Sequence, residues 1–188
     1  MKIGSLFSGY GGLDMAVEKA LNAKVAWHCE FANAPSKILA KNFPEIPNYG
    51  DIEKLDFSKV EPVDILTGGF PCQDVSVAGE RKGLEKGTRS GLWGEFARAI
   101  SELRPKIVVI ENVRGLLNAK ANSGVEYTEE DLADFRGRHP LTAIGAVLWS
   151  LADLGYDARW KLVRASDAGA PHRRERVFIV AYPRDSRS

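Results

Sequence analysis

Of the residues in this sequence, Cys72 has the neighbours that best suit a catalytic nucleophile. It belongs to the segment GGFPCQ at residues 68–73, directly after the apolar run Val63–Thr67. The proline and glycines before the thiol hold it on a fixed backbone at the end of a predicted strand, where a thiolate could attack an electrophilic carbon. A buried structural thiol is the alternative. We predict such a buried structural thiol for Cys29, which lies inside a strand-like stretch and lacks neighbouring proline and glycine residues.

Glu111 and Asn112 end the apolar run Ile107–Ile110. Polar side chains that close a fully apolar strand lie at the edge where parallel sheets bind their ligands. Glu111 is therefore a candidate proton carrier beside Cys72. The alternative is a capped strand end with Asn112 in a turn.

Arg174 and Arg176 lead into a second apolar run, Val177–Val180, within the segment HRRERVFIV at 172–180. Residues two positions apart in a strand point to the same face, so the two guanidinium groups can converge on one anionic or carbonyl-rich target. A solvated basic edge is the alternative.

A glycine-rich turn, FSGYGG at 7–12, separates the first apolar run from a helical pattern. Its glycines allow close approach of a ligand, and the helix that follows offers unpaired N–H groups. Glu30 ends the second predicted strand about 20 residues further on, where a carboxylate reaches ribose hydroxyls, and Asp51 adds a second carboxylate at that edge. These features predict a nucleoside site. A ligand-free turn is the alternative, because the spacing differs from GxGxxG.

The stretches between these sites alternate as in an α/β domain. We predict seven strands and four helices, which form a mostly parallel sheet with helices on both faces. The predicted strands are Lys2–Phe7, Lys24–Glu30, Asn48–Gly50, Val63–Thr67, Lys106–Glu111, Ala158–Val163 and Arg174–Tyr182. The predicted helices are Leu13–Leu21, Ala34–Asn42, Leu92–Leu103 and Leu141–Leu154. Residues 68–91 and 118–140 do not follow the alternation, and we predict a long functional loop and an exposed excursion there.

Composition fits one globular domain. The chain has 188 residues, 44% hydrophobic and 27% charged, with a net charge of +1. The charge is uneven, since residues 172–188 hold five arginines against two acidic residues. Two distant cysteines form neither a disulfide framework nor a metal site, and the N-terminus lacks the apolar core of a signal peptide. We therefore expect a cytoplasmic protein with no membrane anchor and no metal.

Taken together, the segments at 7–12, 68–73 and 172–180 and the ENV at 111–113 resemble the motifs of the C5-cytosine DNA methyltransferase family, in its order and spacing. The likeness covers essentially the whole chain. It implies a Rossmann-like, S-adenosylmethionine-dependent methyltransferase fold, with residues 1–188 forming one catalytic domain that methylates C5 of cytosine in double-stranded DNA. Methylation of tRNA cytosine by the same fold is an alternative. Amino methylation is disfavoured, because the sequence has no Asn/Asp-Pro-Pro-Tyr/Phe/Trp loop.

The resemblance also implies individual roles. Cys72 would add to C6 of a cytosine flipped from the duplex, Glu111 would assist at N3, and Arg176, with Arg174 beside it, would hold O2. The residues implied in cofactor binding are Phe7, Gly9, Gly11, Gly12, Glu30, Phe31, Asp51, Ile52, Pro71 and Leu92. The residues implied in substrate binding are Gln73, Ser76, Arg81 and Asn112, the last of which would brace the Pro71–Cys72 turn.

Two departures from the family stand out. His172 takes the place of the usual Gln, and the sequence has neither the target-recognition region nor the C-terminal helix that normally follow. Three interpretations are open: a split enzyme whose second polypeptide supplies recognition, a minimal enzyme of relaxed specificity, or a non-catalytic remnant that binds DNA or a partner. The retained set of Cys72, Glu111, Arg174 and Arg176 favours a working site.

Overall fold

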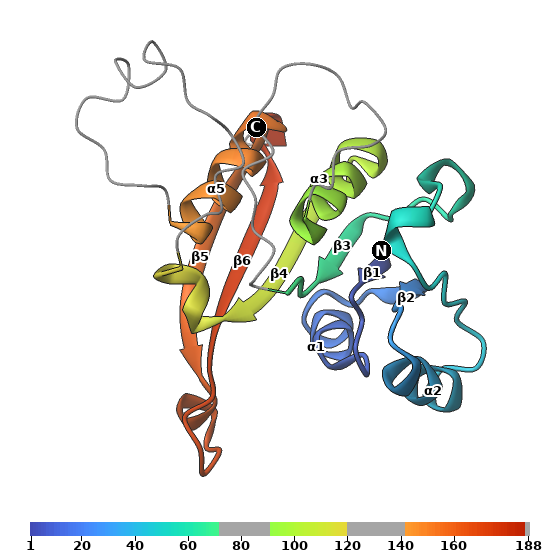
Figure 1. The fold of residues 1–188 in the computed structure, drawn as a ribbon, viewed down its shortest axis with the longest axis horizontal. Helices are drawn as coiled ribbons and strands as arrows, with labels where there is room; N and C mark the ends of the chain where they lie inside the picture. The colour runs from blue at the N-terminus through green and yellow to red at the C-terminus, as the bar shows by residue number, and fades with distance from the viewer. Residues whose placement is uncertain (72–90, 120–141, 187–188) are drawn as a thin grey trace.

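The computed structural model describes residues 1–71, 91–119 and 142–186 of the chain. Over these ranges it contains a six-stranded sheet with the strand order β2-β1-β3-β4-β6-β5 (Figure 1). The strands are β1 (Lys2–Leu6), β2 (Lys24–Cys29), β3 (Ile65–Gly68), β4 (Ile107–Val113), β5 (Tyr156–Arg164) and β6 (Glu175–Pro183). The helices are α1 (Gly12–Leu21), α2 (Asn33–Asn42), α3 (Leu92–Leu103) and α5 (Ala143–Asp153).

The sheet is mixed, with more parallel than antiparallel pairs. β1 pairs in parallel with both β2 and β3, and β3 pairs in parallel with β4. β6 runs antiparallel to both β4 and β5. The predicted mostly parallel sheet is therefore confirmed, with an antiparallel hairpin of β5 and β6 added at one edge.

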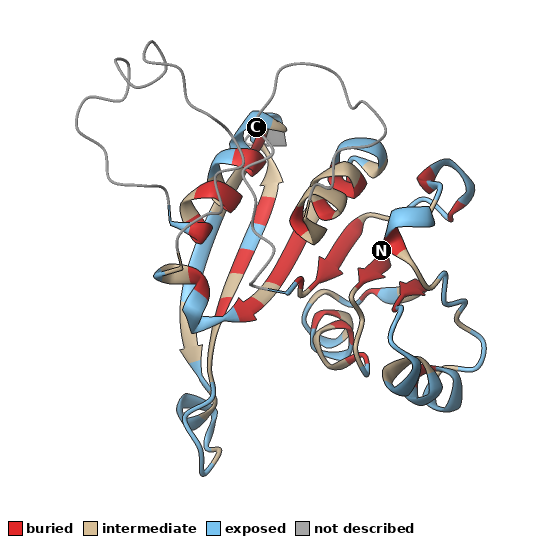
Figure 2. Cartoon of the chain, in the orientation of Figure 1, coloured by how far each residue is buried: buried red, intermediate tan, exposed pale blue. Residues whose placement is uncertain are grey.

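Helices cover both faces of the sheet, as the sequence predicts. On one face α3 and α5 join the larger apolar cluster, whose members include Leu66, Ile110, Ile179, Phe96 and Val147. On the other face α1 packs over a smaller cluster, whose members include Ile3, Ile65, Val109 and Val17. β1, β3 and β4 are mostly buried between these layers, whereas the tip of the β5–β6 hairpin is exposed (Figure 2).

The ends of α1 explain why this helix starts at the glycine turn. Gly11 precedes it with a φ of 85°, a conformation that favours glycine, and Asn22 closes it in the same left-handed region with a φ of 47°. The backbone N–H of Asn22 donates to the carbonyl of Glu18. The turn and the helix are thus fixed relative to β1 by local backbone geometry.

The predicted strand at Asn48–Gly50 is wrong in extent. Only one bridge forms there, in which the N–H of His28 donates to the Pro47 carbonyl at 2.8 Å and the N–H of Tyr49 donates to the His28 carbonyl at 2.9 Å. Gly50 then takes a φ of 74° and turns the chain away from β2. A strand needs an extended backbone, so pairing ends at this glycine.

None of the four helices named above, nor any other helix in the described ranges, is long and apolar enough to cross a bilayer.

Candidate active site

The glycine turn between β1 and α1 is held in an uncommon backbone conformation. Phe7 and Gly9 have φ values of 51° and 57°. A positive φ at a residue other than glycine costs free energy and is concentrated at functional sites. Two hydrogen bonds hold the turn against β2: the N–H of Phe7 donates to the Cys29 carbonyl at 2.8 Å, and the N–H of Gly9 donates to Oε2 of Glu30 at 2.8 Å.

Glu30 connects this turn to the end of β2. Its side chain accepts from Gly9 through Oε2 and from the N–H of Ala32 through Oε1, also at 2.8 Å, and the residue is 9% exposed. Phe31, the next residue, is 75% exposed. The arrangement places an exposed aromatic ring beside a fixed carboxylate, which suits a base and a ribose.

Asp51 and Ile52 lie where the chain has turned away from β2. Asp51 caps a short 3-10 helix, Ile52–Lys54, by accepting from the N–H of Glu53 at 3.1 Å, and the Lys54 ammonium lies 3.1 Å from its other oxygen. Ile52 is buried. Its carbonyl accepts from Nη2 of Arg98 on α3 at 2.8 Å, which links this segment to the helix that begins at Leu92.

A buried polar network, which sequence reasoning did not identify, lies beneath the turn. Asp14 of α1 is 2% exposed and accepts from Ser5 at 2.7 Å and from Thr67 at 2.5 Å. Burial raises the pKa of the Asp14 carboxyl, although both hydrogen bonds oppose that effect. The imidazole of His28 lies 3.8 Å from Asp14, and burial lowers the pKa of this histidine. Asp14 stands in an amphipathic helix, where an aspartate normally indicates the solvent face.

Glu111 and Arg176 form an ion pair at the carboxyl end of β4. Nε of Arg176 lies 2.7 Å from Oε1 of Glu111, and both side chains are partly exposed, by 23% and 30%. A Cβ at Gly69 would lie 3.2 Å from Oε2 of Glu111. Glycine at this position therefore lets the chain after β3 pass close to the carboxylate.

Asn112 ties the end of β4 to the same segment. Its side-chain nitrogen donates to the Phe70 carbonyl at 2.8 Å, its oxygen accepts from the N–H of Val113 at 2.8 Å, and the residue is 4% exposed. The hydrogen bond holds the backbone immediately before Pro71. Asn112 thus makes a bracing contact with the Phe70 carbonyl and also lines the cavity next to Pro71.

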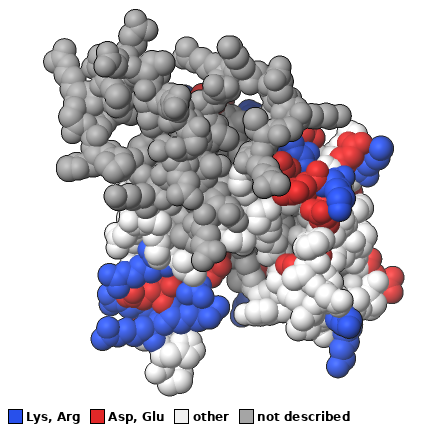
Figure 3. All heavy atoms as spheres, in the orientation of Figure 1, with Lys and Arg blue, Asp and Glu red and all other residues white. Residues whose placement is uncertain are grey.

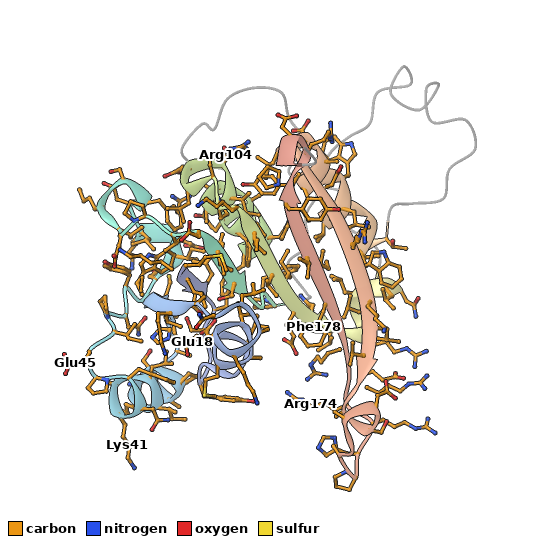
Figure 4. The ribbon with its side chains drawn as sticks, turned by 180° about the vertical axis from the view of Figure 1, so that it is seen from behind. Glu18, Lys41, Glu45, Arg104, Arg174 and Phe178 are labelled. Carbon is orange, nitrogen blue, oxygen red and sulfur yellow. The ribbon has the colours of Figure 1, made fainter. Side chains whose placement is uncertain are left out.

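Arg174 differs from the sequence prediction in one respect. β6 begins at Glu175, and Arg174 precedes it with a φ of 32°, so the alternation of strand side chains does not extend to Arg174. The guanidinium reaches from the hairpin toward α1 (Figure 4). Arg174 and Arg176 line the same two cavities, so their predicted convergence follows from the turn rather than from the strand.

Two neighbouring cavities join these groups. The first, of about 480 Å³, extends from Phe7 and Gly9 past α1 to Glu111 and Arg176. The second, of about 340 Å³, lies between Pro71 and the same Glu111–Arg176 pair. The glycine turn and the Glu111–Arg176 pair therefore line neighbouring cavities. The other predicted nucleoside residues line neither of them: Glu30, Phe31, Asp51 and Ile52.

Glu175 was not singled out by the sequence, because its side chain alternates with the arginines around it. It accepts from Arg114 at 2.6 Å and from Arg164 at 2.9 Å. These hydrogen bonds, that of Arg114 first, lower the pKa of the Glu175 carboxyl. They fix Arg114 and Arg164 beside the end of the hairpin where β5 and β6 are joined.

Cys29 is a buried thiol, as predicted. It is 2% exposed, donates to the Gly50 carbonyl at 3.3 Å, and burial raises its pKa to about 12. Cys72, Gln73, Ser76 and Arg81 lie outside the described residues. Within the ranges that the structure covers, no group of three His, Cys, Asp or Glu side chains is placed to hold a metal ion.

Solved structures share this fold. A DNMT2 mutant from Spodoptera frugiperda matches 98% of this chain and 50% of its own, with a TM-score of 0.70 and 20% identity. A putative DNA modification methyltransferase encoded within an Escherichia coli prophage matches 99% of this chain and 47% of its own, with a TM-score of 0.66 and 26% identity. The expected Rossmann-like methyltransferase fold is thereby confirmed.

Curated relatives agree with the motifs. The type II methyltransferase M.NlaIV of Neisseria lactamica is 35% identical over 185 residues, which are 96% of this chain and 41% of the relative. M.Eco47II of Escherichia coli is 37% identical over 183 residues, again 96% of this chain and 39% of the relative. The chain therefore spans about two fifths of the length of these relatives. The model of the C-5 cytosine-specific DNA methylase family matches residues 1–188, and the chain belongs to that family.

Proposed function

We propose that this chain carries the catalytic machinery of a DNA (cytosine-5-)-methyltransferase. The observation that carries the proposal is the Glu111–Arg176 pair, 2.7 Å apart, in a cavity that Pro71 also lines. Cys72 follows Pro71 directly in the sequence. A carboxyl group and a guanidinium beside a cysteine provide the nucleophile, the proton carrier and the carbonyl ligand that attack on a pyrimidine ring requires.

The residues present fit S-adenosylmethionine as the cofactor. Glu30 and Asp51 supply carboxylates for the ribose and the adenine edge, and the exposed ring of Phe31 is free to stack on the base. Phe7 and Gly9 line the larger cavity, where the methionine part would lie. Gly11, Gly12, Ile52, Pro71 and Leu92 complete the proposed cofactor side.

The proposed mechanism makes C5 of cytosine nucleophilic. The Cys72 thiolate forms a bond to C6 while the C5–C6 double bond gives up its π electrons toward C5. Glu111 hydrogen-bonds or protonates N3, and Arg176 holds O2, so both stabilise the charge that the ring acquires. S-adenosylmethionine, when bound, supplies the methyl group. Water then takes the C5 proton, the C5–C6 double bond re-forms, and the bond from C6 to sulfur breaks and releases the Cys72 thiolate.

The proposed substrate is a cytosine flipped out of double-stranded DNA. Gln73, Ser76 and Arg81 follow Cys72 in the glycine-rich segment that we propose closes over this base. Arg174, in the connection between β5 and β6, brings further positive charge to the cavity that Pro71 lines. Asn112 supports the segment through the Phe70 carbonyl.

Methyl transfer by the chain itself tests the proposal. Purified chain, labelled S-adenosylmethionine and unmethylated DNA should give 5-methylcytosine, whereas Cys72→Ser should give none and Glu111→Gln should be slowed by about 10²-fold or more. Cys29→Ser is the matched control, because Cys29 is buried away from the cavities, and it should retain activity if it folds. Wild-type turnover by Cys72→Ser would refute the proposed nucleophile.

A split enzyme is the second candidate. The observation that favours it is the exposure of apolar side chains on the β4 and β6 strands, Val113 at 40% and Val180 at 41%. In that case a second polypeptide supplies recognition of DNA sequence. Retained cofactor binding without methylation, restored by a recognition-region polypeptide from a family member, would support it.

A further inference from the structure

The Asn48 side chain makes a set of contacts that none of the proposed roles uses. Its Oδ1 accepts from the N–H of Glu30 at 2.9 Å and from the N–H of Gly50 at 3.2 Å. Its Nδ2 donates to the Glu30 carbonyl at 3.1 Å and to Oγ of Ser36 at 3.2 Å. Both backbone polar groups of Glu30 are thus bound by one amide side chain.

This amide continues the pairing of β2 in place of a backbone peptide. The backbone on either side of Asn48 pairs with His28. The next pairing position is Glu30, two residues further along the chain and just past the end of β2. A primary amide has the same donor and acceptor pair as a peptide group, so Asn48 can complete the ladder with its side chain. The main chain is then free to leave the sheet at Gly50, where φ is 74°.

The consequence concerns the two proposed cofactor carboxylates. Glu30 is held by Asn48 through its backbone and holds the glycine turn through its carboxylate, while the N–H of Gly50, the residue before Asp51, is bound to the same Asn48 oxygen. One side chain therefore spans the segments that carry both acids. Ser36 of α2 strengthens the link, because its hydroxyl also donates to the Glu30 carbonyl at 2.9 Å.

We propose that Asn48 is a positioning residue that fixes Glu30 relative to Asp51 and thereby sets the fit of the site for the ribose of an adenosine-containing cofactor. The inference rests on the proposed function. Asn48 itself touches no part of the cofactor in this proposal. Its side chain is exposed, so its removal leaves the apolar core unchanged and water can satisfy the freed groups.

The test compares the affinities of two ligands that differ only in their ribose hydroxyls. A general structural role would weaken the binding of both ligands equally and leave the ratio of their affinities unchanged. Calorimetry would compare S-adenosylhomocysteine with its 2′,3′-dideoxy analogue on wild type, Asn48→Ala and Asn48→Asp. The exposed Asn33 of α2 provides matched controls, Asn33→Ala and Asn33→Asp. Thermal unfolding without ligand would show whether each variant is folded.

In wild type we expect the dideoxy analogue to bind roughly tenfold more weakly, because a hydroxyl bond to a carboxylate is lost. Asn48→Ala should bind S-adenosylhomocysteine roughly fivefold to twentyfold more weakly, and its preference for the ribose hydroxyls should shrink to about twofold. Asn48→Asp keeps both acceptor bonds but loses the donor to the Glu30 carbonyl and adds charge beside two acids. It should show the same loss. Both Asn33 variants should match wild type.

Two outcomes overturn the inference and leave the proposed function intact. The first is an Asn48→Ala protein that keeps the wild-type preference for ribose hydroxyls. The second is equal weakening for both ligands together with a lowered unfolding temperature, which would show a structural role alone. If wild type binds neither ligand, the proposed cofactor site fails and the inference fails with it, so this failure is distinguishable from the other two.

Discussion

At the scale of single residues, Glu30 holds the glycine turn in place, and in the proposed function it also binds the ribose of the cofactor. Its carboxylate accepts from the N–H groups of Gly9 and Ala32 and is nearly buried. In Glu30→Gln the amide nitrogen would face one of these donors, so one hydrogen bond becomes a repulsion. We expect a loss of about 1–3 kcal/mol in the free energy of unfolding, measured by denaturant titration, and weaker binding of S-adenosylmethionine. The exposed Glu45, changed to Gln, is the control and should alter neither. Unchanged affinity in Glu30→Gln would contradict the role.

The Glu111–Arg176 pair leads to a second prediction. Arg176→Lys keeps the charge but loses the planar fork, which holds Glu111 through Nε and the Glu175 carbonyl through Nη1. We expect methyl transfer to slow by about 10²-fold, with cofactor affinity unchanged, because the change removes contacts to Glu111 and the Glu175 carbonyl and none to the glycine turn. Single-turnover rates and cofactor titrations measure the two effects separately. A loss confined to cofactor binding would show that Arg176 acts elsewhere.

The sequence predicts those site residues that close apolar runs. Glu30 and Glu111 were identifiable because each carboxylate directly follows a strand-like apolar stretch, and that position lies at the edge where parallel sheets bind their ligands. Asp14 and Asn48 were not, because an aspartate in a helix and an asparagine before a glycine have ordinary local explanations. Their partners, Thr67 and Glu30, are distant in the sequence and come close only in the folded chain.

At the scale of elements, the fold was largely predictable from periodicity. α3 has the predicted bounds, Leu92–Leu103, since its apolar residues recur at helical spacing. The predicted strand at Asn48–Gly50 failed because a side chain takes over the pairing that the backbone would make. β6 begins one residue later than predicted because Arg174 adopts a positive φ, and no local sequence pattern indicates that conformation.

Gly68 at the end of β3 allows that strand to pack beneath the site. A Cβ there would lie 2.6 Å from the Leu6 carbonyl oxygen and 2.6 Å from the Phe96 ring. Since the first of these is backbone and cannot move aside, Gly68→Ala should lower the free energy of unfolding by about 1–3 kcal/mol. Gly115→Ala, whose new Cβ would lie 3.7 Å from Val113, is the control. Chemical denaturation of both variants tests this, and equal stabilities would contradict the packing described.

His28 in β2 predicts how stability depends on pH. Burial lowers its pKa from 6.5, against the attraction of Asp14 and Glu18, so the unfolded chain takes up a proton before the folded one. The stability from neutral His28 is therefore present above about pH 6.5 and is lost as the pH falls, by at most about 1.4 kcal/mol per pH unit. Asp14 has a raised pKa and acts in the opposite direction. His28→Phe should lose less stability than wild type between pH 7.5 and pH 5.5. Parallel pH profiles would contradict this.

At the scale of the whole molecule, charge is gathered on one projection. Tyr156–Pro183, the β5–β6 hairpin, holds six basic side chains against three acidic ones, in a chain whose net charge is only +1. Figure 3 shows basic side chains around an acidic one on this projection. Lys41 of α2 lies on the opposite side of the molecule, beyond α1 (Figure 4). A polyanion is therefore attracted to the hairpin more strongly than to the side of the molecule that carries Glu30 and Asp51.

Under the proposed function, this asymmetry predicts how the binding of duplex DNA depends on salt. Arg159 and Lys161 of β5 are exposed, and neither lines the cavities that hold the proposed catalytic pair. The double change Arg159→Gln, Lys161→Gln should weaken binding to all duplex sequences alike and lower the slope of log affinity against log salt by about two, because each of the two side chains neutralises one phosphate. The matched pair Lys24→Gln, Lys41→Gln removes the same charge far from the hairpin and should leave the slope near that of wild type. If both pairs lower the slope equally, the effect comes from net charge, and the duplex does not lie along the hairpin.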